Sequence, residues 1–185
     1  MLWGNGSRRP LGAAMDRPGR PVVAVVDQHE FFTQCLVIAL EARGYVCRRV
    51  PLSVEAGRPS RVWSRLASVR PDVALINAEL GRRCGSAPLV AAASQAGVSV
   101  VVLTDITDER HWGEYLAAGA QIVVPKTESL GSMVSTVRKV SHGKPVLALS
   151  ERARLIALGR DCRSGDQAVL RRLERLSKQE RAVLR

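Results

Sequence analysis

The segment 71–80, PDVALINAEL, constrains the fold of this chain more than any other. Residues 73–76 form an apolar run without a polar interruption, and the polar Asn77 follows at once. An apolar run of this length between polar residues is typical of a parallel strand that helices cover on both faces. In open parallel α/β sheets, ligands bind at the carboxyl ends of the strands. The amide of Asn77 therefore stands where a functional group is expected.

Residues 21–143 alternate between strand and helix patterns. The predicted strands are short apolar runs that end at polar residues or turns: Val22–Val26, Tyr45–Val50, Val73–Ile76, Val98–Leu103 and Gln121–Val124. The predicted helices carry apolar residues at helical spacing: Phe31–Arg43, Arg61–Val69, Ala87–Gln95, Asp108–Ala118 and Glu128–Ser141. This alternation predicts an α/β fold, namely a flavodoxin-like, doubly wound, five-stranded parallel sheet.

Polar side chains follow the predicted strands at their carboxyl ends. Right-handed crossovers place all of these ends on one edge of the sheet, which we call the rim. The residues predicted at the rim are Asp27, Gln28, Asn77, Thr104 and Lys126. We expect their side chains to lie close together and to form the candidate functional site.

Both ends of the chain differ from this central pattern. Residues 1–20 contain Gly and Pro without periodicity and predict a disordered leader. Residues 144–176 predict a linker with helices at 150–158 and 168–176, separated by a loop that begins at Gly159. Residues 177–185 begin with Ser-Lys-Gln-Glu, a capping box that opens a helix. We expect this last helix to start a further domain that is truncated in this sequence.

The composition limits the classes of function. A net charge of +11 fits either a polyanionic partner such as nucleic acid or arginines scattered over a solvated surface. The apolar runs are too short to span a membrane, and the N-terminal residues lack the apolar core of a signal peptide. We therefore expect a cytoplasmic protein without membrane contact. The four cysteines show no CxxC spacing and predict free thiols rather than metal ligands.

Four motifs resemble the receiver domain of bacterial response regulators. They are VVDQHE at the first strand, PDVALIN at the third, VVVLTD at the fourth and AGAQIVVPK at the fifth. The tail, LSKQERAVLR, resembles the opening of a LuxR-type helix-turn-helix. The resemblance covers nearly the whole chain after the leader and indicates the NarL/LuxR branch. It implies a transcription regulator that forms a homodimer through its receiver and binds DNA only where the missing C-terminal domain is present.

The resemblance also implies a role for each rim residue. Receivers of this family carry two acidic residues, an acceptor aspartate, a Thr or Ser and a Lys, and their carboxylates bind magnesium. In this sequence the acidic pair corresponds to Asp27 and Gln28, the acceptor corresponds to Asn77, and Thr104 and Lys126 are retained. An amide oxygen cannot form a stable acyl phosphate, and magnesium prefers anionic oxygen ligands. We therefore expect no phosphorylation of aspartate, no metal and no cofactor.

Two further residues depart from the family pattern. Asp105 stands where the family usually has a small residue, and it adds negative charge where a phosphoryl group would lie. Val123 stands at the position of the aromatic switch residue, so the usual rotameric relay is missing. With the other carboxylates lost, we expect Asp27 to form an ion pair with Lys126.

Three hypotheses on function remain open at this stage. The leading one is an atypical response regulator, without catalytic residues, that signals through protein contacts, dimerisation or a small ligand at the rim. The second is a phosphorylatable receiver or phosphate-transfer enzyme that uses a rewired acidic set, Glu79, Asp105 and Asp27. The third is a standalone interaction module without DNA binding. His29 is expected to be a surface residue beside the rim.

Overall fold

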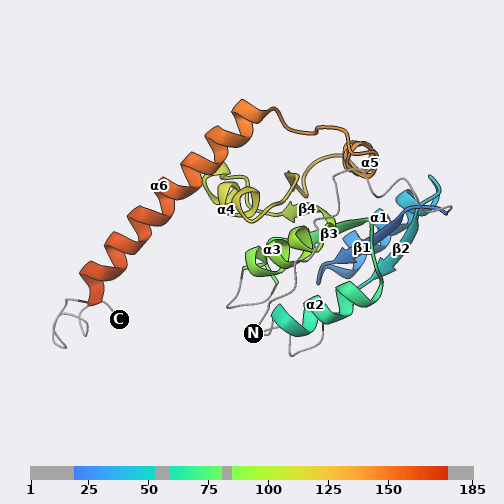
Figure 1. Cartoon of the computed structure of the whole chain (residues 1–185), viewed down its shortest axis with the longest axis horizontal. Helices are drawn as coiled ribbons and strands as arrows, with labels where there is room; N and C mark the ends of the chain where they lie inside the picture. Colours follow the sequence, from blue (N-terminus) through green and yellow to red (C-terminus); the bar gives the residue numbers. More distant parts are fainter. Residues whose placement is uncertain (1–18, 53–58, 81–84, 175–185) are drawn as a thin grey trace, which may run out of the picture.

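The computed structural model describes residues 19–52, 59–80 and 85–174, with side chains of the last helix described as far as Asp161 (Figure 1). Its strands form one parallel sheet in the order β2-β1-β3-β4-β5. The strands are β1 (Val22–Val26), β2 (Val46–Arg49), β3 (Val73–Asn77), β4 (Ser99–Thr104) and β5 (Ile122–Pro125). The doubly wound, five-stranded parallel sheet predicted from the sequence is therefore confirmed.

Helices cover both faces of the sheet. They are α1 (Glu30–Glu41), α2 (Pro59–Ser68), α3 (Ala87–Gln95), the 3₁₀ turn η2 (Glu109–His111), α4 (Trp112–Ala117), α5 (Leu130–Ser141) and α6 (Leu149–Glu174). The helix predicted from Asp108 to Ala118 begins with η2, whose N-cap is Asp108; the Asp108 side chain accepts a hydrogen bond from the backbone of Arg110. None of the helices in the described ranges is both long and apolar enough to cross a membrane.

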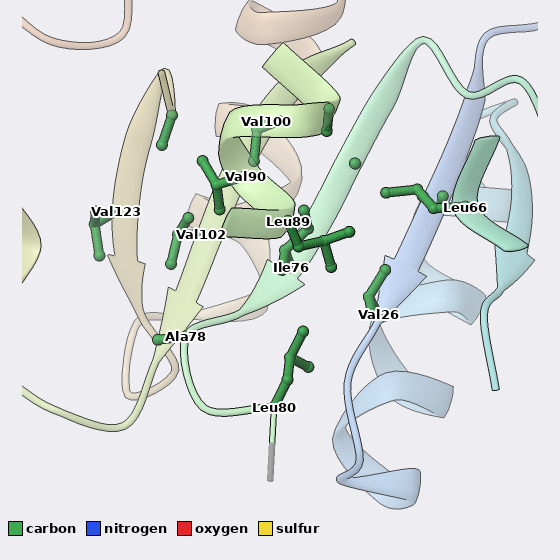
Figure 2. Close-up of a cluster of buried hydrophobic side chains, with 14 of the residues drawn as sticks. Val26, Leu66, Ile76, Ala78, Leu80, Leu89, Val90, Val100, Val102 and Val123 are labelled. Carbon is green, nitrogen blue, oxygen red and sulfur yellow. The ribbon is translucent and has the colours of Figure 1, made fainter. Parts of the chain in front are cut away.

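Two apolar layers hold the helices on the sheet. Residues of α1 and α5 pack on one face. Residues of α2, α3, α4 and α6 pack on the other face, against Val26, Ile76, Val102 and Val123 (Figure 2). Burial on both faces is what the unbroken apolar runs of the strands predicted.

The structure corrects the prediction for the linker. We expected two helices with a loop from Gly159, but α6 is one continuous helix of 26 residues. Gly159 is buried inside this helix, and a methyl group on its Cα would lie 2.9 Å from the Cα of Gly113 in α4. The glycine therefore allows two helices to approach closely, and it does not end a helix. The sequence alone could not separate these two uses of glycine.

The ends of the predicted domains fall differently in the structure. Arg20, which we placed in the leader, donates hydrogen bonds from its guanidinium to the backbone oxygens of Gly44 (2.6 Å) and Glu41 (3.5 Å). Leu155 of α6 is buried in the apolar layer beneath α3 and α4, although we placed it in the linker. Residues 1–18 of the leader and the capping box at 177–180 lie outside the described residues.

Candidate functional site

The carboxyl ends of the strands bring the predicted side chains to one rim. Val26 pairs with Ile76, Asn77 pairs with Leu103, and Thr104 pairs with Pro125 in the parallel register. Asp27 and Lys126 directly follow β1 and β5, while Asn77 and Thr104 are the last residues of β3 and β4. Gln28 lies at the same end of the sheet, but its side chain points to solvent.

The ammonium group of Lys126 is the centre of the site. Its Nζ lies 2.9 Å from Asp27 Oδ2, 3.2 Å from Asp105 Oδ2 and 3.0 Å from His29 Nδ1. The Asp27 side chain is fully buried, the Lys126 side chain is 7% exposed and the Asp105 side chain is 53% exposed. The ion pair between Asp27 and Lys126 that the sequence predicted is confirmed. Two carboxylates thus surround the ammonium, and His29 Nδ1 accepts from it only when that ring nitrogen carries no proton.

His29 lies at the surface beside the rim, as predicted, but its contacts with the site were not predicted. Its backbone N–H donates to Asp27 Oδ1 at 2.9 Å, and its ring Nδ1 lies 2.9 Å from the same oxygen. The ring is half exposed, as expected of a surface residue, yet it contacts both Asp27 and Lys126. An aspartate that accepts from the backbone two residues later forms an Asx turn, so the Asp-x-His spacing was the available signal. Phe32 lies beneath the ammonium, with its ring centroid 5.3 Å from Nζ.

Asn77 is fully buried and held in one orientation. Its Nδ2 donates a hydrogen bond of 2.9 Å to the backbone oxygen of Glu79. Its Oδ1 has no hydrogen-bond partner among the residues that the structure describes. A carboxylate at this position would place an oxygen against the Glu79 carbonyl in place of a donor. The local backbone therefore suits an amide better than an acid.

The residue directly after β3, Ala78, is held by two donors to its carbonyl. The Tyr115 hydroxyl of α4 donates to the backbone oxygen of Ala78 at 3.2 Å, and the Ser86 backbone N–H donates to it at 3.0 Å. Burial raises the pKa of Tyr115 to about 12, so its hydroxyl remains a donor at physiological pH. These bonds hold the backbone that follows Asn77.

Thr104 and Val123 are both buried beside the rim. The Thr104 hydroxyl accepts a hydrogen bond of 3.0 Å from the backbone N–H of Ile106. Val123 packs in the apolar layer against α3 and α4, without a polar group that could follow a change at the rim. The side chain of Val123 therefore contributes aliphatic packing at this position.

The described side chains do not fit a magnesium ion. No group of three or more His, Cys, Asp or Glu in the described ranges is placed to hold a metal. The one buried carboxylate, Asp27, is already neutralised by Lys126 at 2.9 Å. Glu79 and Asp105 are exposed and do not join Asp27 in such a group, so the rewired acidic set is not assembled.

Solved structures that share this architecture include receiver domains and response regulators. The signal receiver domain of the putative response regulator NarL from Mycobacterium tuberculosis aligns over 69% of this chain and 100% of its own, with 20% identity and a TM-score of 0.57. A two-component response regulator of the LuxR family from Aurantimonas sp. SI85-9A1 aligns over 77% and 99%, with 16% identity and a TM-score of 0.61. The chain has the receiver fold.

A third receiver-containing structure agrees with this fold. A DNA-binding response regulator of the LuxR family from Staphylococcus aureus aligns over 65% of this chain and 98% of its own, with 13% identity and a TM-score of 0.56. No protein-family model matches this chain, and no curated protein matches its sequence. The likeness at these identities concerns the receiver fold alone.

Proposed function

We propose that this chain is the receiver part of an atypical response regulator of transcription, which is not phosphorylated on aspartate. The observation that carries the proposal is the rim itself. A buried amide, Asn77, stands at the acceptor position, and Lys126 is bound by the two aspartates and the histidine around it. The regulator would then signal through protein contacts, dimerisation or a small ligand, without a phosphoryl group.

The charges at the rim also oppose phosphorylation. Phosphoryl transfer relies on a carboxylate nucleophile and on cations that neutralise the charge of the phosphoryl group. The single cation, Lys126, is already neutralised by Asp27 and contacts Asp105, so the three groups sum to one negative charge. An incoming phosphate would meet that negative charge without a metal ion to offset it.

Acetyl phosphate with magnesium, followed by intact-mass measurement, tests the proposal. We expect no phosphoryl adduct on the full chain. We also expect none on the Asn77→Asp variant, because Gln28 still replaces an acidic residue of the pocket and Asp105 still adds negative charge where a phosphoryl group would lie. A phosphorylatable receiver treated in the same way controls for the reagent. A hydroxylamine-labile adduct of one phosphoryl group on the unmodified chain would overturn the proposal.

The course of α6 supports a regulator over a standalone module. Its first turns pack on α4, and the helix then continues past Gly159 and extends beyond the sheet (Figure 1). A helix that leaves the domain surface is suited to connect the receiver to a further part of a protein. DNA binding is proposed only for a chain that carries a complete helix-turn-helix.

A second copy of the chain is the partner that we propose for the receiver. The side of the sheet that carries α4 is covered by α6, whereas Phe31 and Ile38 on α1 are large apolar side chains exposed to solvent. Sedimentation equilibrium tests this, with Ile38→Glu expected to shift the chain toward monomer and Leu149→Glu, a change at an exposed apolar residue of α6, as the control. A chain that is monomeric throughout would remove dimerisation from the proposal.

A further inference from the structure

The edge of the sheet opposite the rim carries positive charge that the chain does not neutralise. The strands begin at this edge, and α1 and α2 end there, because each of them leads directly into the next strand. No ion pair in the described ranges involves the six exposed cations on the segments that meet there. We call these cations the basic end: Arg20, Arg43, Arg70, Arg138, Lys139 and Lys144. The acids of the same segments, 20–22, 41–46, 68–73 and 138–144, are Glu41 and Asp72.

Hydrogen bonds bring these segments together. The Arg20 guanidinium donates to the backbone oxygen of Gly44 at 2.6 Å, just after the end of α1. The hydroxyl of Tyr45 lies 3.2 Å from that of Ser141, which places the end of α5 beside the end of α1. The end of α2 joins them where it leads into β3, since β3 pairs with β1 in parallel. The six cations therefore belong to one end of the domain, although they are distant in the sequence.

The helix dipole accounts for part of the basic end. A cation in the last turn of a helix is stabilising because it faces the unpaired carbonyl groups there. This reason covers Arg138 and Lys139 in the last turn of α5. It also covers Arg43, which donates to the backbone oxygen of Ala39 in α1 at 3.1 Å. It does not explain the backbone conformation of Arg70.

Arg70 stands where the other helices that lead off the sheet end with glycine. Its φ of 47° lies in the left-handed region, and no other residue except glycine in the described ranges has such a φ. Glycine is favoured at this position because a side chain crowds the backbone. The chain has glycines at the matching positions after α1, α3, α4 and α5: Gly44, Gly97, Gly119 and Gly143. An exposed arginine is thus retained where glycine would be less strained, which points to a use for its side chain.

We propose that the basic end binds an acidic segment of a partner protein. Guanidinium and ammonium groups pair with carboxylates, and cations without partners on one face attract a molecule of opposite charge. The proposal rests on the proposed function in one respect, because it names the chemistry of a protein contact through which the regulator would signal.

The direction of α6 favours a protein over a nucleic acid at this end. Arg152 of α6 donates to the backbone oxygen of Leu116 at the end of α4 at 2.7 Å, whereas Gly159 lies against Gly113 at its beginning. The beginning of α4 lies on the rim side, because it follows β4, so α6 runs from the basic end toward the rim and beyond (Figure 1). A DNA-binding part attached to α6 would therefore lie away from the basic end.

Fluorescence anisotropy of a labelled oligoglutamate peptide, titrated with the full chain, tests the proposal. One variant removes three cations of the basic end: Arg43→Gln, Arg70→Gln and Lys139→Gln. It should weaken binding by about five- to ten-fold, as suits the loss of three exposed ion pairs. The matched control removes three exposed arginines elsewhere: Arg49→Gln, Arg110→Gln and Arg160→Gln. It lowers the net charge equally and should weaken binding by less than about two-fold, because distant exposed charges are screened.

A glycine at position 70 separates binding from folding. Arg70→Gly removes the charge and relieves the left-handed backbone. This variant should bind the peptide about two-fold more weakly, without a lower midpoint of urea denaturation. A lower midpoint with unchanged binding would mean that Arg70 serves the fold alone, and it would overturn the inference.

Two further outcomes would overturn the proposal. Equal weakening by the two triple variants would mean that only the net charge matters. A labelled DNA duplex of unrelated sequence is the competing polyanion, and its binding should respond equally to both triple variants. Selective loss of duplex binding in the basic-end variant would assign this end to nucleic acid instead. The experiment contains no phosphoryl donor, so its outcome is independent of the acetyl phosphate test.

Discussion

Lys126 Nζ lies 2.9 Å from Oδ2 of Asp27, a carboxylate whose side chain is fully buried. The chain thus supplies its own cation to the one buried acid of the rim. The charge of Asp27 is balanced by Lys126, and the buried side chain of Asn77 is a neutral amide. The following expectations test what this site and the docked helix α6 contribute to stability.

The first expectation concerns the ion pair itself. Lys126→Met should lower the free energy of unfolding by on the order of 3 kcal/mol, because it leaves the buried Asp27 carboxylate without its cation. Asp27→Asn in the same chain should recover part of this loss. Urea denaturation of the two single variants and the double variant measures the coupling. The exposed Lys144→Met serves as the control, and strictly additive effects would mean that the pair contributes nothing.

A pair of leucines in α6 tests whether this helix belongs to the folded core. Leu155 is 3% exposed in the apolar layer, whereas Leu149 at the start of the helix is 85% exposed. Leu155→Ala should cost about 2–5 kcal/mol, and Leu149→Ala should change the free energy of unfolding by less than about 0.5 kcal/mol. Thermal and urea denaturation of both variants give the comparison. Equal, small effects would indicate that α6 does not contribute to the stability of the receiver.

The sheet and most of the rim could be predicted from the sequence because their determinants are local. Each strand is an apolar run of a few residues, and the residue that follows it lies at the rim whatever the loops do. The Lys126–Asp27 pair followed from counting the charges left at the rim. These predictions required no knowledge of how distant side chains are oriented.

The parts that could not be predicted depend on contacts between distant segments. Gly159 looks like a helix end until Gly113 is known to lie against it. His29 is a surface residue, as predicted, but its contact with Lys126 becomes evident only when the sheet brings the ends of β1 and β5 together. The hydrogen bond from Asn77 to the Glu79 carbonyl depends on the loop backbone, which the sequence does not reveal. In each case one residue type permits two structures, and the tertiary fold selects one.

The thiol of Cys47 gives an expectation on pH. Burial raises its pKa to about 11, from an ordinary value near 9. As the pH rises from 9 to 11 the unfolded chain loses this proton first, so the free energy of unfolding contributed by the thiol falls over that window. Cys47→Ala should make the decline of stability between pH 9 and 11 shallower, by on the order of 1–2 kcal/mol. The half-buried Cys35→Ala is the control, and identical slopes in the two variants would contradict the expectation.

The contact between Gly113 and Gly159 gives the last expectation. A methyl group on Gly159 would lie 2.9 Å from the Cα of Gly113 and 3.2 Å from the backbone nitrogen of Glu114, and neither atom can move without shifting α4. The helix propensity gained by alanine is up to about 1 kcal/mol, whereas overpacking costs about 1–3 kcal/mol. Gly159→Ala should therefore lower the free energy of unfolding by about 1–2 kcal/mol and speed amide exchange in the docked turns of α6.

The same substitution in an open position provides the control for that expectation. Gly131 in α5 is exposed, and a methyl group there would come no closer than 4.0 Å to the Ser129 hydroxyl. Gly131→Ala should therefore stabilise the chain by about 0.5–1 kcal/mol, since alanine has a higher helix propensity than glycine and the added methyl group meets no close atom. Opposite signs for the two variants in urea denaturation would support a close α4–α6 contact in solution. A Gly159→Ala chain as stable as Gly131→Ala would mean that the two helices do not touch at this point, because nothing else at Gly159 opposes the added methyl group.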